Sequence, residues 1–188
     1  LAAIKSPRTD GSAEAALLGL LTEGEKHPYQ IEKDVQFRDM RFWTELSMSA
    51  IYKTLVKLET LGYVESSTEI SEENRARKIY KITPEGIEAF KDKLTELVAE
   101  PEHVRWQSEI AFYNFDIFPK DTQITLLKSY RKKLEEKISC YRDLEAFLIK
   151  EGCSMYPISI SLRPIYLLQG EILWVDDFID KISKTTGK

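Results

Sequence analysis

The sequence predicts a mainly α-helical protein in two unequal parts, the first of which contains a β-hairpin. Apolar residues recur at spacings of three and four along much of the 188 residues, as they do on the buried side of a helix. Two runs, 63–70 and 77–83, are rich in β-branched and aromatic residues and flank a polar connector, which is typical of a hairpin. Pro101 follows a helical pattern and marks the boundary. The expected parts are a flexible extension, 1–12, a first domain, 13–98, and a helical second domain, 102–183.

The composition is that of a globular protein. Hydrophobic residues make up 43% and charged residues 31%, and 27 basic against 31 acidic residues give a formal net charge of −4. No apolar stretch is long enough to cross a membrane, and residues 1–12 contain no apolar block for a signal peptide, so we expect a cytoplasmic protein with no membrane partner. The mild acidity argues against coating nucleic acid by bulk charge, so any nucleic-acid binding must come from a local patch.

Residues that carry enzyme or metal chemistry are scarce. Two cysteines, Cys140 and Cys153, provide neither a disulfide framework nor a zinc set. Two histidines, His27 and His103, leave little material for acid–base or metal chemistry. The sequence has no glycine-rich phosphate loop, no histidine pair at ligand spacing and no Ser-His-Asp set. We therefore expect no enzyme activity, no metal and no cofactor.

Helix signals divide the start of the first domain. Ser12 is a candidate N-cap for a helix over 13–22, Gly24 is a stop signal, and Pro28 is placed to open a second short helix. In that second helix the bulky side chains are Tyr29, Ile31 and Val35, and the expected solvent side is Glu32, Lys33 and Asp34.

A third helix follows an irregular segment, Arg38–Trp43. Either Ser47 or Ser49 can cap it, and Gly62 is expected to end it in the left-handed conformation. After the hairpin, Pro84 begins a fourth helix. The predicted buried stripes are Ile51, Leu55 and Leu58 on the third helix and Ile87, Phe90, Leu94 and Leu97 on the fourth.

The second domain is predicted to be helical. An aromatic-rich segment, 102–118, precedes a long helix over 121–151 and a last helix over 160–183, whose apolar positions step alternately by three and four, as in a coiled-coil seam. Two such stripes leave more apolar surface than one hairpin covers, which favours a homodimer; the alternative is that both helices fold back on the first domain. The residues expected in the dimer contact are Ile124, Leu127, Leu134, Ile138, Ile165, Leu168, Ile172, Val175 and Ile179.

Three short helices followed by a two-stranded hairpin is the layout of a winged helix-turn-helix. A helix fits the major groove of B-DNA, and a β-ribbon reaches the neighbouring backbone. Opposite its buried stripe the third helix offers polar, small and cationic side chains, although an ordinary solvated face is the alternative. The second strand and its approach, 74–84, contain four cations and no acid. These side chains are Ser49, Tyr52, Lys53, Thr54 and Lys57 on the helix and Arg75, Arg77, Lys78 and Lys81 on the wing.

Five stretches of the first domain resemble the PadR family of transcriptional regulators. They are 17–21 (LLGLL), 27–31 (HPYQI), 49–59 (SAIYKTLVKLE), 61–65 (LGYVE) and 78–86 (KIYKITPEG). Each stretch alone is a weak signal for the family, but five stretches in this order and at these separations form a specific one. The similarity covers about 13–90, and the helical remainder is similar to the longer PadR subgroup through less specific motifs.

The resemblance implies a sequence-specific DNA-binding transcriptional regulator, a cytoplasmic homodimer that binds double-stranded DNA at a pseudo-palindromic operator, usually as a repressor. In the family, the tyrosine of the His-Pro-Tyr stretch and the Ser-x-x-Tyr helix approach DNA, and basic wing residues touch its backbone. The corresponding residues are Tyr29, Ser49, Tyr52, Lys53 and Lys57, with Arg75, Arg77 and Lys78 on the wing. We expect Tyr29 and Ser49 to hold phosphates, Lys53 and Thr54 to read bases, and the wing cations to position the protein.

Two features stay open. The Arg38–Trp43 segment departs from the plain loop of many relatives, and it contacts either DNA or the second subunit. The family often responds to small aromatic or lipophilic compounds, so Trp106, Phe112, Tyr113 and Trp174 are candidates for an effector pocket; the alternative is that they are core. A winged-helix module for protein contact, without DNA binding, is the alternative for the whole chain, and the acidic balance supports it.

Overall fold

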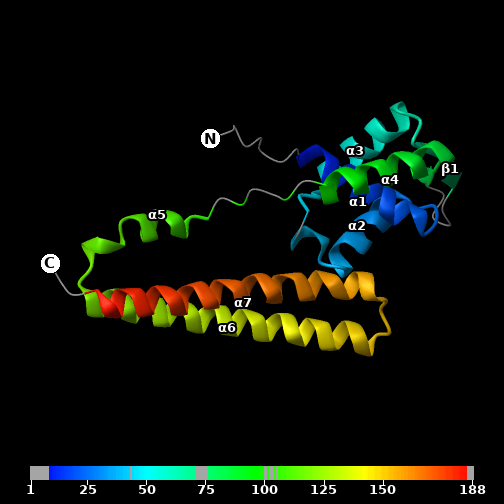
Figure 1. Cartoon of the computed structure of the whole chain (residues 1–188). Helices are drawn as coiled ribbons and strands as arrows, with labels where there is room; N and C mark the ends of the chain where they lie inside the picture. Colours follow the sequence, from blue (N-terminus) through cyan, green and yellow to red (C-terminus); the bar gives the residue numbers. More distant parts are fainter. Residues whose placement is uncertain are drawn as a thin grey trace. The chain divides into compact units, whose positions relative to one another are not determined.

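A computed structural model describes residues 9–42, 44–70, 76–99, 101, 104 and 106–185. The chain divides into two compact units, Leu1–Arg105 and Trp106–Lys188, and each is described by itself (Figure 1). Most of the expected N-terminal extension, residues 1–8, lies outside the described part. None of the described helices is both long and apolar enough to cross a lipid bilayer.

The first unit contains three helices, a hairpin and a fourth helix, so the predicted winged helix-turn-helix is confirmed. Its elements are α1 (Thr9–Thr22), α2 (Pro28–Phe37), the short 3₁₀ helix η1 (Met40–Phe42), α3 (Met48–Thr60), β1 (Val64–Ile70), β2 (Ala76–Ile82) and α4 (Pro84–Ala99). Helix α1 begins at Thr9, so Ser12 lies inside the helix and is not its cap. A single glycine, Gly11, does not stop a helix whose next residues are rich in alanine and leucine.

The core of this unit lies between α1, α2, α3 and the hairpin. The predicted stripe of α3 is confirmed, because Ile51, Leu55 and Leu58 are fully buried. They pack with aliphatic side chains of α1 and α2, and Val64 and Tyr80 of the hairpin belong to the same cluster. Burial of one side of α3 leaves its opposite side to solvent, as expected for an amphipathic helix.

The ends of α3 settle the capping question. Ser47 is the N-cap, and its hydroxyl accepts a hydrogen bond from the backbone N–H of Ala50 at 3.2 Å. Ser49 lies inside the helix, with its hydroxyl 3.0 Å from that of Ser47. Gly62 follows the helix with φ of 75°, the left-handed conformation that the sequence predicts.

The antiparallel hairpin is fastened to the segment that precedes α2. Residues Val64 and Ile82 pair at its base, and Ile70 pairs with Ala76 near its tip. Lys26 and Tyr80 exchange backbone hydrogen bonds in both directions, each at 3.0 Å. This bridge holds the first residues of α2 beside the second strand of the wing.

One residue of α2 differs from the prediction. Glu32, expected on the solvent side, is only 9% exposed, whereas Tyr29, expected to meet DNA, is 57% exposed. The buried carboxylate is stable there because Gln36 and Arg41 both donate hydrogen bonds to it.

On α4 the predicted stripe is covered only in part. Phe90 packs against α1, where its ring lies 3.2 Å from the position that a Cβ on Gly19 would occupy. Ile87, Leu94 and Leu97 remain exposed, so the contact of α4 with α1 does not cover the whole stripe.

The second unit is a long helical hairpin with a short aromatic segment. Its elements are α5 (Ser108–Tyr113), the 3₁₀ helix η2 (Phe115–Ile117), α6 (Lys120–Lys150) and α7 (Met155–Lys184). Helices α6 and α7 lie side by side and are joined through a turn at Gly152, which has φ of 70° (Figure 1). Helix α7 begins five residues before the expected Ile160, since Pro157 falls within its first turn, where proline needs no N–H partner.

The two predicted stripes of this unit face each other within one chain. Leu127, Leu134, Ile138, Ile165 and Val175 are buried, and Leu168, Ile172 and Ile179 are half-buried against the cluster. Ile124 is half-buried on α6. The buried seam residues are thus accounted for by packing between α6 and α7, and their contact with a second copy stays a prediction.

Candidate nucleic-acid interface

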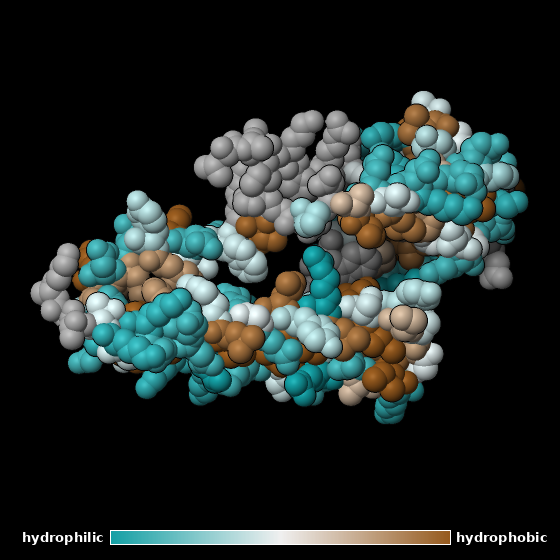
Figure 2. All heavy atoms as spheres, viewed as in Figure 1, coloured by the Kyte–Doolittle hydropathy of each residue, from teal (hydrophilic) through white to brown (hydrophobic). Residues whose placement is uncertain are grey.

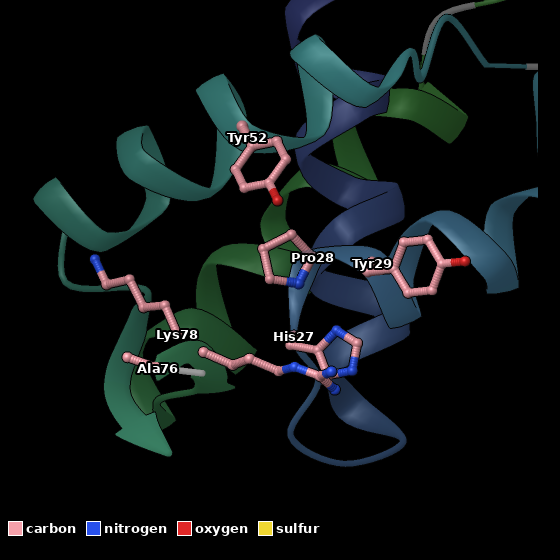
Figure 3. A pocket seen from close by; sticks show the side chains of 7 residues that line it. His27, Pro28, Tyr29, Tyr52, Ala76 and Lys78 are labelled. Atoms are coloured by element: carbon pink, nitrogen blue, oxygen red, sulfur yellow. The ribbon is translucent and has the colours of Figure 1, made fainter. Parts of the chain in front are cut away.

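Three elements that are distant in the sequence line one pocket of the first unit. The start of α2 contributes His27, Pro28 and Tyr29, α3 contributes Tyr52, and β2 contributes Ala76, Arg77 and Lys78. The pocket has a volume of about 290 Å³, and Figure 3 shows the labelled side chains arranged around it. The fold therefore brings the predicted tyrosines of α2 and α3 together with the predicted cations of the wing.

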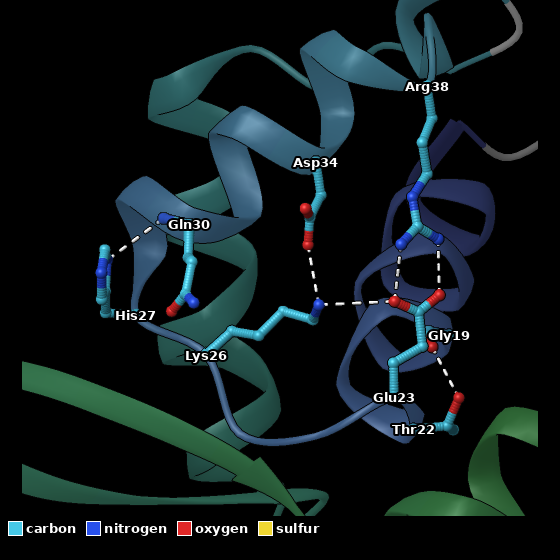
Figure 4. Close-up of polar contacts among 8 residues, drawn as sticks. All are labelled: Gly19, Thr22, Glu23, Lys26, His27, Gln30, Asp34 and Arg38. Carbon is cyan, nitrogen blue, oxygen red and sulfur yellow. Dashed lines mark hydrogen bonds and ion pairs between the residues drawn. The ribbon is translucent and has the colours of Figure 1, made fainter.

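His27 also lines this pocket, although the sequence predicts no binding role for it. It caps α2, since its Nδ1 accepts a hydrogen bond from the backbone N–H of Gln30 at 3.1 Å (Figure 4). Burial lowers the pKa of the imidazole, and the positive charge of Arg77 lowers it further. The neutral ring, with Nδ1 acting as acceptor, carries its proton on Nε2 and can donate one hydrogen bond. The sequence signal for this role is a histidine directly before the proline that opens a helix.

The two tyrosines at the pocket are exposed enough to meet a ligand. Tyr29 stacks on His27 with ring centroids 6.3 Å apart, and the ammonium of Lys33 lies 4.9 Å from the centroid of its ring. Tyr52 is 48% exposed on α3. A phenol hydroxyl can donate to a phosphate oxygen, so both residues suit contact with a polyanion.

The outer side of α3 carries most of the side chains predicted there. Ser49 and Lys53 are exposed, and Thr54 is half-buried. Ser49 lies three residues before Tyr52, which places both on neighbouring positions of one helix face. This face is opposite the buried stripe and contains the polar and cationic groups that contact with base edges requires.

Lys57 is exposed on α3, and its ammonium also has a partner within the fold. Its ammonium lies 2.6 Å from a carboxylate oxygen of Glu14 in α1, and Lys93 of α4 pairs with the other oxygen. Burial alone raises the pKa of Glu14, but the hydrogen bonds from the two lysines outweigh burial and leave that pKa below its ordinary value. Lys57 therefore ties α3 to α1 through a buried carboxylate, which is a contact within the fold.

The wing carries less excess positive charge than its second strand suggests. Lys78 donates to Glu59 of α3 at 2.7 Å, and this hydrogen bond raises the pKa of Lys78. Ser66 of β1 donates to the same carboxylate at 2.5 Å. Arg77 pairs in register with Glu69, and Lys81 lies 3.7 Å from Glu65. Acids of α3 and β1 thus offset the cations of β2. Arg75 lies outside the described residues.

Two of the four aromatic residues proposed for an effector pocket are in contact in the second unit. Phe112 and Trp174 make an edge-to-face contact with centroids 4.8 Å apart, and Phe112 also contacts Tyr130. Tyr113 is 88% exposed and Trp106 is about half exposed. The structure therefore brings Phe112 and Trp174 together, and it does not place Tyr113 in that cluster.

Tyr130 adds a polar group to this aromatic cluster. Its hydroxyl donates to the carboxylate of Glu171 on α7. Burial, followed by the hydrogen bond to that carboxylate, raises the pKa of Tyr130 to about 12. Within the described part of the chain there is no group of three or more His, Cys, Asp or Glu side chains that could hold a metal ion.

Part of the first unit matches a known protein family, and the chain is similar to several solved structures. The family model described as the transcriptional regulator PadR-like family matches residues 17–92. No curated protein matches the chain. Bacillus subtilis PadR in complex with operator DNA is similar in structure, with a TM-score of 0.72 and 22% identity over 91% of this chain and 99% of that one.

Two further structures are similar over nearly the whole chain. Bacillus subtilis PadR in complex with p-coumaric acid has a TM-score of 0.73 and 21% identity, covering 97% of this chain and 100% of that one. The Vibrio cholerae virulence activator AphA has a TM-score of 0.62 and 18% identity, covering 91% of this chain and 98% of that one. At these identities the likeness shows the winged-helix fold with its helical C-terminal region.

Proposed function

The chain belongs, through residues 17–92, to the PadR-like family of transcriptional regulators, which are not enzymes, and from this premise we propose that it is a sequence-specific DNA-binding repressor. The proposed form is a cytoplasmic homodimer on a pseudo-palindromic operator. One observation supports it most: the start of α2, the outer face of α3 and the wing line a single pocket with exposed tyrosines and cations. The structurally similar Bacillus subtilis PadR, seen with operator DNA, supports the same ligand.

In this proposal each element has its own part in binding. Helix α3 enters the major groove, where Lys53 and Thr54 contact base edges. Tyr29 and Ser49 hold phosphates on either side, and Arg77 places the wing against the backbone. Because phosphate contacts release counterions, the logarithm of the affinity should fall linearly with the logarithm of the salt concentration.

Homodimerisation is supported by apolar side chains that the α6–α7 hairpin leaves exposed. Figure 2 shows apolar side chains over parts of the visible face of this hairpin. The exposed large side chains of α7 include Tyr156, Tyr166, Leu167 and Leu173. Two-fold pairing is the commonest way to cover such a surface. The two copies of α3 would then lie about 34 Å apart, one turn of DNA, or at a multiple of that spacing.

Fluorescence anisotropy with a duplex selected by the protein from a random-sequence pool, and with a shuffled duplex, tests the assignment. Lys53→Ala should reduce the preference for the selected duplex, whereas Arg77→Ala should weaken both duplexes alike and lower the salt slope by about one. Lys91→Ala, which removes an exposed lysine of α4, is the matched control and should leave both affinities unchanged.

Two results would overturn the assignment. Unchanged affinity after the double change Lys53→Ala and Arg77→Ala would show that DNA uses another surface. Failure of the wild-type chain to enrich any duplex at low salt would favour a protein-contact module instead.

Release by a small aromatic ligand belongs to the same proposal and is supported by the p-coumaric acid complex of Bacillus subtilis PadR. Titration of the DNA complex with p-coumaric acid should lower the anisotropy, and Phe112→Ala should weaken that response.

A reporter gene placed behind the selected duplex measures the sign of regulation. Expression should fall as the amount of the protein rises. Expression that rises with the protein, as expected of an activator such as AphA, would contradict repression.

A further inference from the structure

Arg41 sits in the turn between α2 and α3 and makes contacts in two directions. Its Nη2 donates to both carboxylate oxygens of Glu32, each at 2.7 Å. Its Nε donates to the backbone carbonyl of Leu46 at 2.8 Å. The sequence left this segment open between DNA and a second subunit, and the structure gives the guanidinium partners inside the fold.

Both partners of Arg41 are fixed by their surroundings. Glu32 is nearly buried on α2 and also accepts a hydrogen bond from Gln36 at 2.7 Å. Leu46 is fully buried, and the next residue, Ser47, is the N-cap of α3. Arg41 thus joins the anchored side of α2 to the backbone directly before α3.

We propose that Arg41 is a positioning residue that sets where α3 begins, and so where Ser49 and Lys53 meet DNA; this rests on the proposed function. The buried stripe of α3 holds the helix to the core, while the contacts of Arg41 with Glu32 and the Leu46 carbonyl fix the backbone directly before the first turn of α3. Hydrogen bonds to base edges weaken steeply outside about 2.7–3.2 Å, so a small shift of that turn reduces discrimination between sequences. Contacts that flexible side chains make with phosphates tolerate the same shift.

The same turn contains a matched control. Arg38 donates to both oxygens of Glu23 at 2.5 and 2.6 Å, another two-pronged arginine–carboxylate pair, and Glu23 lies directly after α1 (Figure 4). Lys26 links that carboxylate to Asp34 of α2. Arg38→Ala therefore removes an equivalent ion pair that leaves the start of α3 untouched.

The experiment compares wild type, Arg41→Ala, Arg41→Lys and Arg38→Ala. Affinity is measured for the selected and the shuffled duplex at several salt concentrations, and thermal unfolding is recorded for each protein. Both Arg41 variants should lower the ratio of the two affinities about tenfold, the size of one poorly placed base contact. Affinity for the shuffled duplex and the salt slope should stay unchanged, and Arg38→Ala should keep the wild-type ratio.

Arg41→Lys decides the case if Arg41→Ala does not fold. A lysine keeps the charge but cannot donate to Glu32 and to the Leu46 carbonyl in the fixed geometry of a guanidinium. A wild-type ratio in Arg41→Lys overturns the proposal. A loss of affinity for both duplexes with a salt slope smaller by about one also overturns it, because Arg41 would then touch phosphate directly. A wild-type chain that selects no duplex overturns the proposed function itself, which the wild-type measurement alone reveals.

Discussion

Replacement of Gly86 by alanine should strongly destabilise the first unit, although a change from glycine to alanine usually stabilises a helix. Gly86 lies in the first turn of α4 and is buried beside Tyr63, which directly precedes β1, and Ile82 of β2. A Cβ at this position would lie 2.0 Å from the backbone oxygen of Tyr63 and 2.9 Å from Cγ1 of Ile82. The clash is with backbone, so a side-chain rotation does not relieve it.

The magnitude follows from what must move. Tyr63 O accepts a hydrogen bond from the N–H of Thr83 at 3.1 Å, and the Thr83 hydroxyl accepts one from the N–H of Gly86 at 3.0 Å. Overpacking costs about 1–3 kcal/mol, and each hydrogen bond that is weakened costs about 1 kcal/mol. Alanine returns about 0.5–1 kcal/mol by its helix preference. The balance is a loss of about 2–4 kcal/mol, which lowers the melting temperature of a unit of this size by roughly 10–30 °C.

Urea unfolding followed by far-UV circular dichroism measures this, with Gly170→Ala as the control. Gly170 lies in α7, and a Cβ there would meet no atom within 4 Å. Gly170→Ala should therefore stabilise the second unit by about 0.5–1 kcal/mol. Equal or greater stability of Gly86→Ala relative to wild type would refute the reasoning.

Two paired carboxylates, Glu14 and Glu59, give further predictions. The folded-state pKa of Glu14 is lowered from 4.5, so its carboxylate stabilises the fold above pH 4.5, and this stability is lost as the pH falls through the lowered pKa. Glu14→Gln should therefore make the stability depend less on pH in the acid range. Urea midpoints between about pH 3 and 7 measure this, and curves parallel to wild type would contradict it. Glu59→Gln should strengthen DNA binding and steepen the salt slope by about one, because it releases the ammonium of Lys78 for phosphate. Glu65→Gln is the control, because it removes one negative charge from β1 without breaking a short hydrogen bond. An equal change of the salt slope in both variants would argue against release of Lys78.

Local patterns predicted the elements of this protein well where the signal is periodic. The stripe of Ile51, Leu55 and Leu58 is buried as expected, and Gly62 ends α3 in the left-handed conformation. Helix starts were predicted less well, as at α1 and α7, because several residues in a row can begin a helix at nearly equal free energy. The choice between Ser47 and Ser49 as cap needed the backbone of the turn.

In the candidate interface, the sequence predicts which side chains are exposed better than it predicts which charged side chains pair. Exposure of Ser49 and Lys53 follows from helical spacing, whereas the engagement of Lys57 with Glu14 and of Lys78 with Glu59 does not. Those partners are far apart along the chain, and no spacing rule links them. The sequence does not predict the place of His27 in the pocket, because that place depends on a helix start packed beside a strand about fifty residues later in the chain.

The sequence by itself determined the order of the main helices and strands, the buried stripe of α3 and the resemblance of the first domain to the PadR-like family, because these depend on the types and spacing of side chains along the chain. Only the tertiary structure decided which charged residues face outward and which hold the fold together. Charge pairs form between side chains that packing brings within hydrogen-bond distance, so Arg41, Lys57 and Lys78 acquire their partners only after the helices and the wing have assembled.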